Sequence, residues 1–114
     1  SIIKEQFEYA IKHLKTYCQD NNIDLVFVLF PGLSGNYVNP ELDAPIIEAK
    51  NILNNNSIGY VDLKPYYQAD VNFLSDLALH KNDKCHFNAL GHKLTAEIIY
   101  KFLEGYEKNK TSYK

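Results

Sequence analysis

The sequence predicts an α/β fold in which helices cover both faces of a parallel sheet. Two apolar segments, residues 23–30 and 58–63, have the composition of buried strands, and amphipathic helical patterns precede, separate and follow them. Strands that alternate with helices pair in parallel, because each connecting helix carries the chain back across one face of the sheet. The expected order is helix, strand, helix, strand, a long connection, and helix.

The composition indicates one folded domain and no highly charged partner. The chain has 114 residues, of which 46% are hydrophobic and 13% aromatic, as is typical of a globular protein. Its formal net charge of -2 gives no electrostatic argument for binding nucleic acid, so no nucleic-acid partner is predicted. No apolar run approaches the ~20 residues that cross a bilayer. The compartment is left open between the cytoplasm and export.

The first helix is expected over residues 2–20, where apolar residues recur at helical spacing and Asn21 and Asn22 end the pattern. Cys18 lies on its apolar face, and we interpret it as a small core residue. The nearly continuous apolar segment 23–30 is typical of a central parallel strand that is covered on both faces. Pro31 stops this strand, because proline cannot supply the next N–H group of the ladder.

The loop at residues 31–39 is expected at the edge of the sheet that faces a substrate, because sites in open parallel sheets lie at the carboxyl ends of the strands. Ser34 and Asn36, within Gly32-Leu33-Ser34-Gly35-Asn36, are its candidate substrate-loop residues. The segment lacks the last glycine of a Gly-x-Ser-x-Gly nucleophile elbow, and no helix follows at once. A simple turn is therefore favoured, and Ser34 as a nucleophile is the alternative.

The middle of the chain predicts a second helix, a second strand and a long connection. Either Asn39-Pro40 or Asp43-Ala44-Pro45 begins the helix, since proline is tolerated in a first turn. Asp62 in the second strand is placed to hold a loop by hydrogen bonding. The connection, residues 64–82, is expected to contain a short helix around residues 72–79. His80 lies in it, but no third ligand with suitable spacing joins His80 and His86, so no metal and no cofactor is predicted.

The residues that carry a chemical hypothesis lie just before the last helix. Asp83 precedes His86 by three residues, a spacing that brings two side chains to one side of a helical turn. Such an acid can hold an imidazole in one tautomer while the other ring nitrogen acts as a base. Cys85 lies beside His86, and the sequence assigns no role to its thiol. Asn88 is expected to cap the final helix.

The final helix is expected to end the domain, which we place at residues 1–106. His92 falls in its first turn, where we interpret it as a structural residue. Residues 107–114 are rich in lysine and polar residues, and a frayed polar tail is expected there.

The block Asp83-x-x-His86-Phe87-Asn88-x-x-Gly91-His92 resembles the last conserved block of the SGNH (GDSL-type) hydrolases, which reads roughly D-x-x-H-P-N-x-x-G-H. Phe87 stands where proline is usual, which should loosen the turn without removing a chemical group. The strand ending in Pro31 and the segment 59–63 extend the resemblance upstream in the family order. It implies a flavodoxin-like, three-layer α/β/α fold and a serine esterase in which His86 is the general base and Asp83 orients it.

The family's Gly-Asp-Ser and Gly-x-Asn-Asp motifs, which supply the nucleophile and oxyanion donors, do not occur in this sequence. The resemblance therefore implies the C-terminal half of such a domain, inactive alone, with the missing N-terminal half as its partner. The start of the chain directly on a helix agrees with that expectation. The implied substrates are small-molecule, glycan or lipid esters.

Two alternatives stay open at the level of sequence. A carbohydrate O-acetyltransferase or acetylesterase of the same fold would use the same pair of residues. A non-catalytic α/β binding module would keep the sheet only for packing or for a partner. Two strands leave an apolar sheet edge exposed, so the sequence also predicts that the chain can form a homodimer through that edge.

Overall fold

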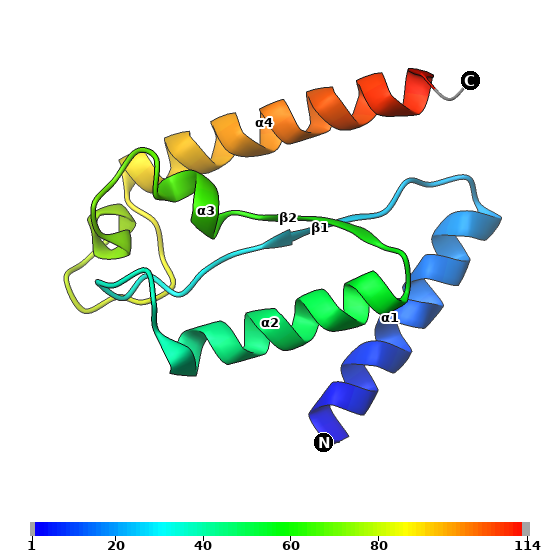
Figure 1. Ribbon diagram of the computed structural model, residues 1–114, viewed down its shortest axis with the longest axis horizontal. Coiled ribbons are helices and arrows are strands. Elements are labelled where there is room, and N and C mark those ends of the chain that lie inside the picture. The colour runs from blue at the N-terminus through cyan, green and yellow to red at the C-terminus, as the bar shows by residue number, and fades with distance from the viewer. Residues whose placement is uncertain (1, 113–114) are drawn as a thin grey trace.

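The computed structural model describes residues 2–112, with side chains described as far as residue 108. It has a mixed α/β fold with a two-stranded parallel sheet, in which Val26 lies opposite Gly59 and Leu29 opposite Asp62 (Figure 1). The mixed class and the parallel pairing predicted from the sequence are confirmed. The elements are α1 (Ile2–Asp20), β1 (Val26–Leu29), α2 (Pro40–Asn55), β2 (Gly59–Asp62), α3 (Lys64–Tyr67), the short 3-10 helix η1 (Leu74–Leu77) and α4 (Ala89–Ser112).

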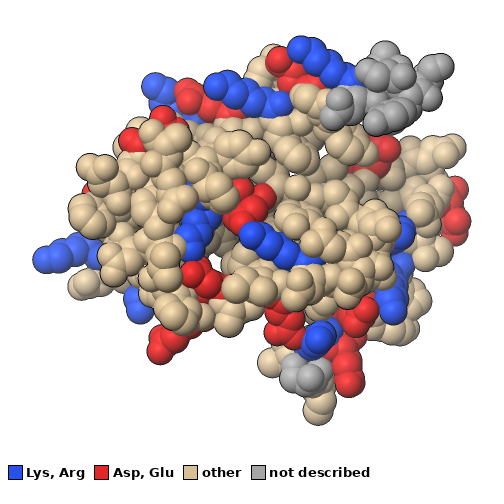
Figure 2. Space-filling view, viewed as in Figure 1, with Lys and Arg blue, Asp and Glu red and all other residues tan. Residues whose placement is uncertain are grey.

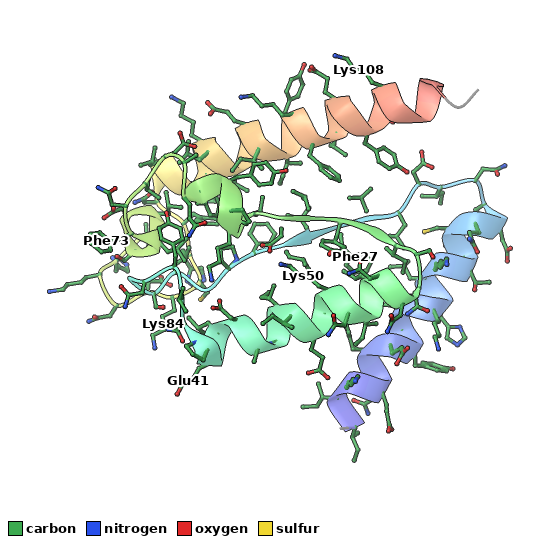
Figure 3. The ribbon with its side chains drawn as sticks, viewed as in Figure 1. Phe27, Glu41, Lys50, Phe73, Lys84 and Lys108 are labelled. Atoms are coloured by element: carbon green, nitrogen blue, oxygen red, sulfur yellow. The ribbon has the colours of Figure 1, made fainter. Side chains whose placement is uncertain are left out.

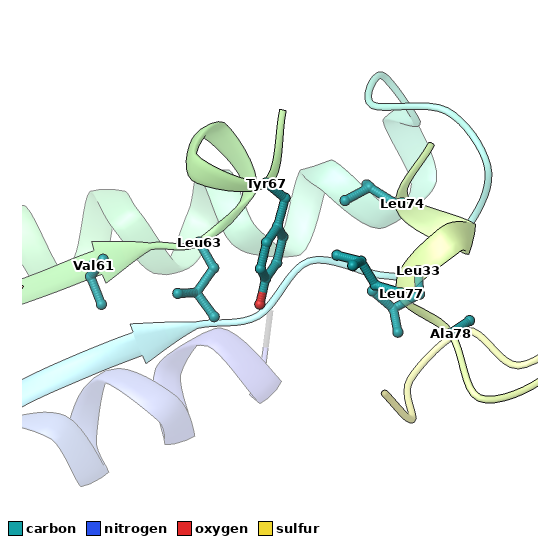
Figure 4. Close-up of a cluster of buried hydrophobic side chains, with 7 residues drawn as sticks. All are labelled: Leu33, Val61, Leu63, Tyr67, Leu74, Leu77 and Ala78. Carbon is teal, nitrogen blue, oxygen red and sulfur yellow. The ribbon is translucent and has the colours of Figure 1, made fainter. Parts of the chain in front are cut away.

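The sheet lies between two layers of helices. Figure 1 shows α4 along one side of the strands, and α1 and α2 along the other. Each side has its own apolar cluster. The cluster on the α1 and α2 side contains Ile11, Leu29, Ile52, Leu53 and Ile58. The cluster on the α4 side, drawn in Figure 4, contains Leu33, Val61, Leu63, Tyr67, Leu74, Leu77 and Ala78.

The amphipathic patterns predicted the first two helices well. α1 covers the predicted residues, and Asn22 follows it with a left-handed φ of 55°, a conformation that asparagine tolerates. Asn39 caps α2, because its side-chain oxygen accepts a hydrogen bond from the N–H of Leu42 at 3.4 Å, and Pro40 occupies the first turn. Of the two predicted starts, Asn39-Pro40 is therefore the one used, and Pro45 lies inside the helix.

Three expectations about the elements need correction. β1 is shorter than residues 23–30, and Ile23 and Phe30 at the ends of that segment are 49% and 50% exposed. Coverage of the whole segment on both faces was wrong, because Ile23 and Phe30 lie outside the residues that pair with β2. The helix predicted around residues 72–79 is only the single turn of η1. α4 continues to Ser112, so the predicted fraying of residues 107–112 is wrong; the rest of that tail lies outside the described residues.

Charged side chains of both signs are interspersed on the face seen in Figure 2. One such pair ties α2 to the sheet, because the ammonium of Lys50 forms an ion pair with Asp62 of β2. Figure 3 shows Lys50 and Phe27 in the layer between α2 and the strands. Asp62 also accepts a hydrogen bond from the N–H of Lys64 at 3.2 Å, which confirms that it holds the loop after β2. No helix in the described part of the chain is both long and apolar enough to span a membrane.

Candidate active site

The segments that follow the two strands meet at one edge of the sheet. Both strands run toward the end of the molecule where α3, η1 and the loop before α4 gather (Figure 1). The N–H of Leu33, in the loop after β1, donates a hydrogen bond of 2.8 Å to the carbonyl oxygen of Lys84. Figure 3 labels Lys84 at this end of the molecule. The predicted position of the loop 31–39 beside the Asp83–His86 block is therefore confirmed.

The backbone around His86 is held by a short antiparallel contact with the end of η1. The N–H of Leu79 donates to the carbonyl oxygen of His86, and the N–H of Asn88 donates to the carbonyl oxygen of Leu77, each at 2.8 Å. Ala78 and Phe87 form the β-bridge between these two bonds. This pairing fixes the direction of the chain where the candidate base lies.

Asn88 fixes the start of α4, as the sequence predicted. Its side-chain oxygen accepts a hydrogen bond from the N–H of Gly91 at 2.9 Å, which caps the helix. Its side-chain nitrogen donates to the carbonyl oxygens of Asp76 and Ala78. One asparagine thus joins α4 to η1 directly beside the candidate site.

Asp83 and His86 lie in direct contact. Oδ2 of Asp83 is 2.9 Å and Oδ1 is 3.1 Å from Nδ1 of His86. Oδ1 also accepts hydrogen bonds from the N–H groups of Cys85 and His86, each at 3.0 Å. These backbone hydrogen bonds, followed by the interaction with His86, lower the pKa of Asp83 to about 2. The predicted proximity is confirmed, and the catalytic role stays a prediction.

This geometry selects one tautomer of the neutral imidazole. An ionised carboxylate only accepts hydrogen bonds, so Nδ1 carries the hydrogen and Nε2 keeps its lone pair. The side chain of Asp83 is 15% exposed, whereas that of His86 is 72% exposed. Nε2 makes no hydrogen bond within the described residues. The pair therefore presents the basic nitrogen Nε2 to solvent, while the carboxylate of Asp83 holds Nδ1.

His86 borders an open depression of about 390 Å³. The ring of Phe87 lines this depression and lies 6.0 Å from the ring of Phe30 and 5.7 Å from that of His92. On its buried side the same ring meets Tyr67 edge-on at 6.1 Å. The lining consists of Phe30, Pro31, Leu79, Cys85, His86, Phe87 and His92.

The two substrate-loop candidates do not join the pair. The hydroxyl of Ser34 accepts a hydrogen bond of 2.9 Å from the side-chain nitrogen of Asn39, at the cap of α2. Asn36 is exposed in the same loop. Within the described residues neither side chain forms a hydrogen bond with Asp83 or His86. The turn interpretation of this segment agrees with the structure, and the roles of both residues stay predictions.

Cys85 belongs to the site geometrically, although the sequence assigned it no role. Its sulfur lies 3.6 Å from Oδ1 of Asp83 and 3.5 Å from Nδ1 of His86. Partial desolvation, and then the nearby Asp83 carboxylate, raise the pKa of this thiol. The sequence prediction weighed His80 with His86 as metal ligands and did not include Cys85. The run Asp83-x-Cys85-His86, with three kinds of donor within four positions, is the sequence signal for this cluster.

The comparisons with known proteins leave the family undecided. No family model, no curated protein and no solved structure gave a significant match to this chain.

Proposed function

We propose that this chain supplies the histidine base and the orienting aspartate of an SGNH (GDSL-type) serine ester hydrolase, as the C-terminal half of a flavodoxin-like, three-layer domain. The observation that carries the proposal is the contact of 2.9 Å between Asp83 and Nδ1 of His86. Its position after the parallel strands, where open sheets place their sites, supports the proposal. The helices on both faces of the sheet agree with the three-layer arrangement.

The proposed reaction is acyl transfer from an ester to water. Nε2 of His86 takes the proton of a serine hydroxyl while the serine oxygen attacks the ester carbonyl. The ionised Asp83 stabilises the imidazolium that forms and keeps the ring from rotating. The imidazolium then protonates the departing alkoxide, and a water molecule, activated by the same nitrogen, releases the acid from the acyl-serine. The serine and the oxyanion donors would come from the part of the domain that carries the two motifs missing from this sequence.

The lining of the depression supports an ester substrate. Phe30, Pro31 and Phe87 give it an apolar wall beside an exposed basic nitrogen, which suits an acyl chain or an apolar leaving group. Glycan, lipid and small-molecule esters all fit this chemistry. A carbohydrate O-acetyltransferase or acetylesterase would use Asp83 and His86 in the same way and differ in the molecule that accepts the acyl group.

The test measures the rate at which the full-length protein hydrolyses esters. His86→Ala should reduce turnover to the background rate. Asp83→Asn keeps a side-chain oxygen for the backbone N–H groups but loses the charge, and it should lower kcat by roughly 10³–10⁴-fold. His80→Ala, which removes an exposed histidine from the same connection, is the matched control and should retain activity. Undiminished turnover in His86→Ala would refute the assignment.

A non-catalytic α/β binding module is the second candidate, and the open faces of the molecule favour it. Both outer edges of the two-stranded sheet are unpaired within the described residues. α1 also exposes large apolar side chains, among them Ile2 and Ile3, which are 73% and 79% exposed. Such surfaces suit another part of the same domain or a second copy of the chain. This candidate predicts that His86→Ala changes neither binding nor any measurable turnover.

A further inference from the structure

Asp83, Cys85 and His86 bring three kinds of metal-binding atom together within four positions of the chain. The carboxylate oxygen, the sulfur and the imidazole nitrogen all lie within 4.8 Å of one another. Cys85 and His86 are exposed, so an ion has direct access from solvent. The carboxylate is already fixed by two backbone N–H groups. These donors therefore come together without any rearrangement of the backbone.

The distances between the donors match the edges of a tetrahedral site. A zinc ion binds sulfur at about 2.3 Å and nitrogen or oxygen at about 2.0–2.1 Å, so the tetrahedral angle separates sulfur from either lighter atom by about 3.5 Å. The sulfur of Cys85 is 3.5 Å from Nδ1 of His86 and 3.6 Å from Oδ1 of Asp83. The third edge, between Nδ1 and the same Oδ1, is 3.1 Å and would lengthen by a few tenths of an ångström once the shared hydrogen is replaced.

We propose that Asp83, Cys85 and His86 form a three-ligand site for Zn²⁺ or a similarly soft divalent cation, with the fourth position open to solvent. Thiolate and imidazole ligands select such ions over Mg²⁺ and Ca²⁺, which prefer oxygen. The ion replaces the hydrogen that Nδ1 of His86 shares with Oδ1 of Asp83. The Cys85 thiol gives its proton to solvent on binding, and the Nδ1 proton reappears on Nε2, so one proton is released for each ion bound.

Metal binding at this site would switch off the histidine base. With the ion on Nδ1, the neutral ring carries its hydrogen on Nε2, and that nitrogen can no longer accept a proton from a serine hydroxyl. This consequence rests on the proposed function, whereas the metal site itself does not. The cluster then makes the enzyme sensitive to Zn²⁺.

The direct test is a titration of the full chain with Co²⁺, which gives an intense thiolate-to-metal absorption band when cysteine is a ligand. The protein is kept reduced with a phosphine, which leaves no competing thiol. A saturable band at one ion per chain is expected, and Zn²⁺ should abolish it by displacing Co²⁺. Cys85→Ala should lose the band. His86→Ala and Asp83→Asn should weaken binding by at least roughly 10–100-fold, the loss typical even for removing a hydrogen-bond partner of a metal ligand.

The controls separate this site from the other thiol and the other nearby histidine. Cys18→Ala removes the buried cysteine of α1, and His80→Ala removes an exposed histidine that lies outside the cluster. Both should keep the band and the affinity of the parent chain. A band that persists in Cys85→Ala, a band lost in Cys18→Ala, or the absence of any thiolate band would overturn the site.

A second measurement tests the link to catalysis. In the active form of the protein, the Zn²⁺ concentration that halves the rate should rise at least about tenfold in Cys85→Ala, with each form compared to its own metal-free rate. If Co²⁺ binds as expected but Zn²⁺ leaves ester hydrolysis unchanged, the switch is refuted and the metal site stands. If Co²⁺ fails to bind, the metal site is refuted, and the proposed esterase stands or falls on His86→Ala alone.

Discussion

Gly91 determines how closely α4 can approach the segment that holds His86. A Cβ atom at this position would lie 2.8 Å from the carbonyl oxygen of Leu77 and 2.6 Å from Cδ1 of Phe87. The first of these atoms belongs to the backbone and cannot rotate away. The carbonyl of Leu77 also accepts the hydrogen bond from Asn88, so displacing it would disturb the cap of α4.

Gly91→Ala is therefore expected to destabilise the fold by about 1–3 kcal/mol through overpacking. Gly105→Ala is the matched control on the same helix, because a Cβ there has no neighbour within 4 Å. That change should stabilise the protein by about 0.5–1 kcal/mol, since glycine weakens a helix interior. Urea unfolding of the two variants and the parent measures both effects. Equal unfolding midpoints for the two variants would contradict the close packing at Gly91.

The residue-scale features that the sequence predicted are those set by local spacing. The caps Asn39 and Asn88 were predictable because each residue directly precedes a periodic apolar pattern. The contact between Asp83 and His86 was predictable because the two residues are three positions apart. The contact between Leu33 and Lys84 joins positions far apart in the chain, and no local pattern encodes it. The sequence did not predict a role for Cys85, because Asp83 and His86 already match a catalytic pair, and such a pair needs no third donor.

α3 is joined to α4 by a buried pair of hydroxyl groups. Tyr67 is fully buried, and its hydroxyl forms a hydrogen bond with that of Thr95. Thr95 donates its own hydrogen to the carbonyl oxygen of Gly91 at 2.7 Å, so Tyr67 must be the donor to Thr95. Burial raises the pKa of Tyr67, which keeps the phenol protonated. The pair orders α3 against the turn of α4 that contains Gly91.

A double-mutant cycle tests this hydrogen bond between Tyr67 and Thr95. Tyr67→Phe should lower the free energy of unfolding by about 1 kcal/mol, the net value of a typical hydrogen bond. Thr95→Val leaves the buried hydroxyl of Tyr67 without its partner and should lower the free energy of unfolding by about 1–3 kcal/mol. The double variant should be more stable than the sum of the two losses predicts, because no polar group is then left unsatisfied. Strict additivity of the three free energies of unfolding would show that the two hydroxyls are not coupled.

An ion pair joins α2 to α3. Oδ1 of Asp43 is 2.7 Å from the ammonium of Lys64, and Oδ2 accepts a hydrogen bond from the N–H of Asn39 at 3.0 Å. The hydrogen bond from Lys64, followed by that from Asn39, lowers the pKa of Asp43. Because the folded pKa lies below the unfolded one, the stabilisation is complete above the ordinary carboxyl pKa and disappears as the pH falls through the lowered value.

Asp43→Asn is therefore expected to be less stable than the parent at neutral pH, with a difference that shrinks as the pH falls below the ordinary carboxyl pKa and through the lowered pKa of Asp43. Asp20→Asn, at a carboxylate with no ion pair in the described residues, serves as the matched control for the change from carboxylate to amide. Free energies of unfolding from urea titrations at several pH values measure both. A difference for Asp43→Asn that is independent of pH would show that this ion pair adds no stability.

Among the elements, those with long periodic patterns were predictable and the short ones were not. α1 and the start of α4 follow from many apolar positions at helical spacing. α3 and η1 are single turns that tertiary packing selects, with Tyr67, Leu74 and Leu77 buried in the cluster of Figure 4. Their sequences contain too few turns to show a period. The ends of β1 were overestimated because the apolar run continues beyond the residues that β2 pairs.

The whole molecule is more open than a compact domain of its length. Its radius of gyration is 15.7 Å, whereas about 13 Å is typical for a compact chain of this size. The molecule is flat, with principal-axis extents of 44 × 37 × 18 Å, and its sheet has only two strands. The sequence predicted the open edges from the number of strands.

Residues 1–114 alone are expected not to hydrolyse esters. The Asp83–His86 pair provides a base, but no serine in the described residues forms a hydrogen bond with His86, and the family motifs that supply the nucleophile and oxyanion donors do not occur in the sequence. The loss of even one oxyanion donor costs roughly 3 kcal/mol of transition-state stabilisation. Ser34 lies in the loop that contacts Lys84, but its hydroxyl is hydrogen-bonded to the side chain of Asn39 instead. Most of the barrier to acyl transfer should therefore persist in this chain.

The measurement is hydrolysis of a short activated ester by the purified chain, by Ser34→Ala and by His86→Ala. A slow rate that does not saturate and is unchanged in Ser34→Ala is the expected result, because any exposed imidazole cleaves activated esters weakly. Saturable turnover that both substitutions abolish would make Ser34 the nucleophile and would overturn the proposal that the serine comes from another part of the domain. In that case the loop after β1 would have to rearrange, releasing the Ser34 hydroxyl from Asn39 so that it could reach Nε2 of His86.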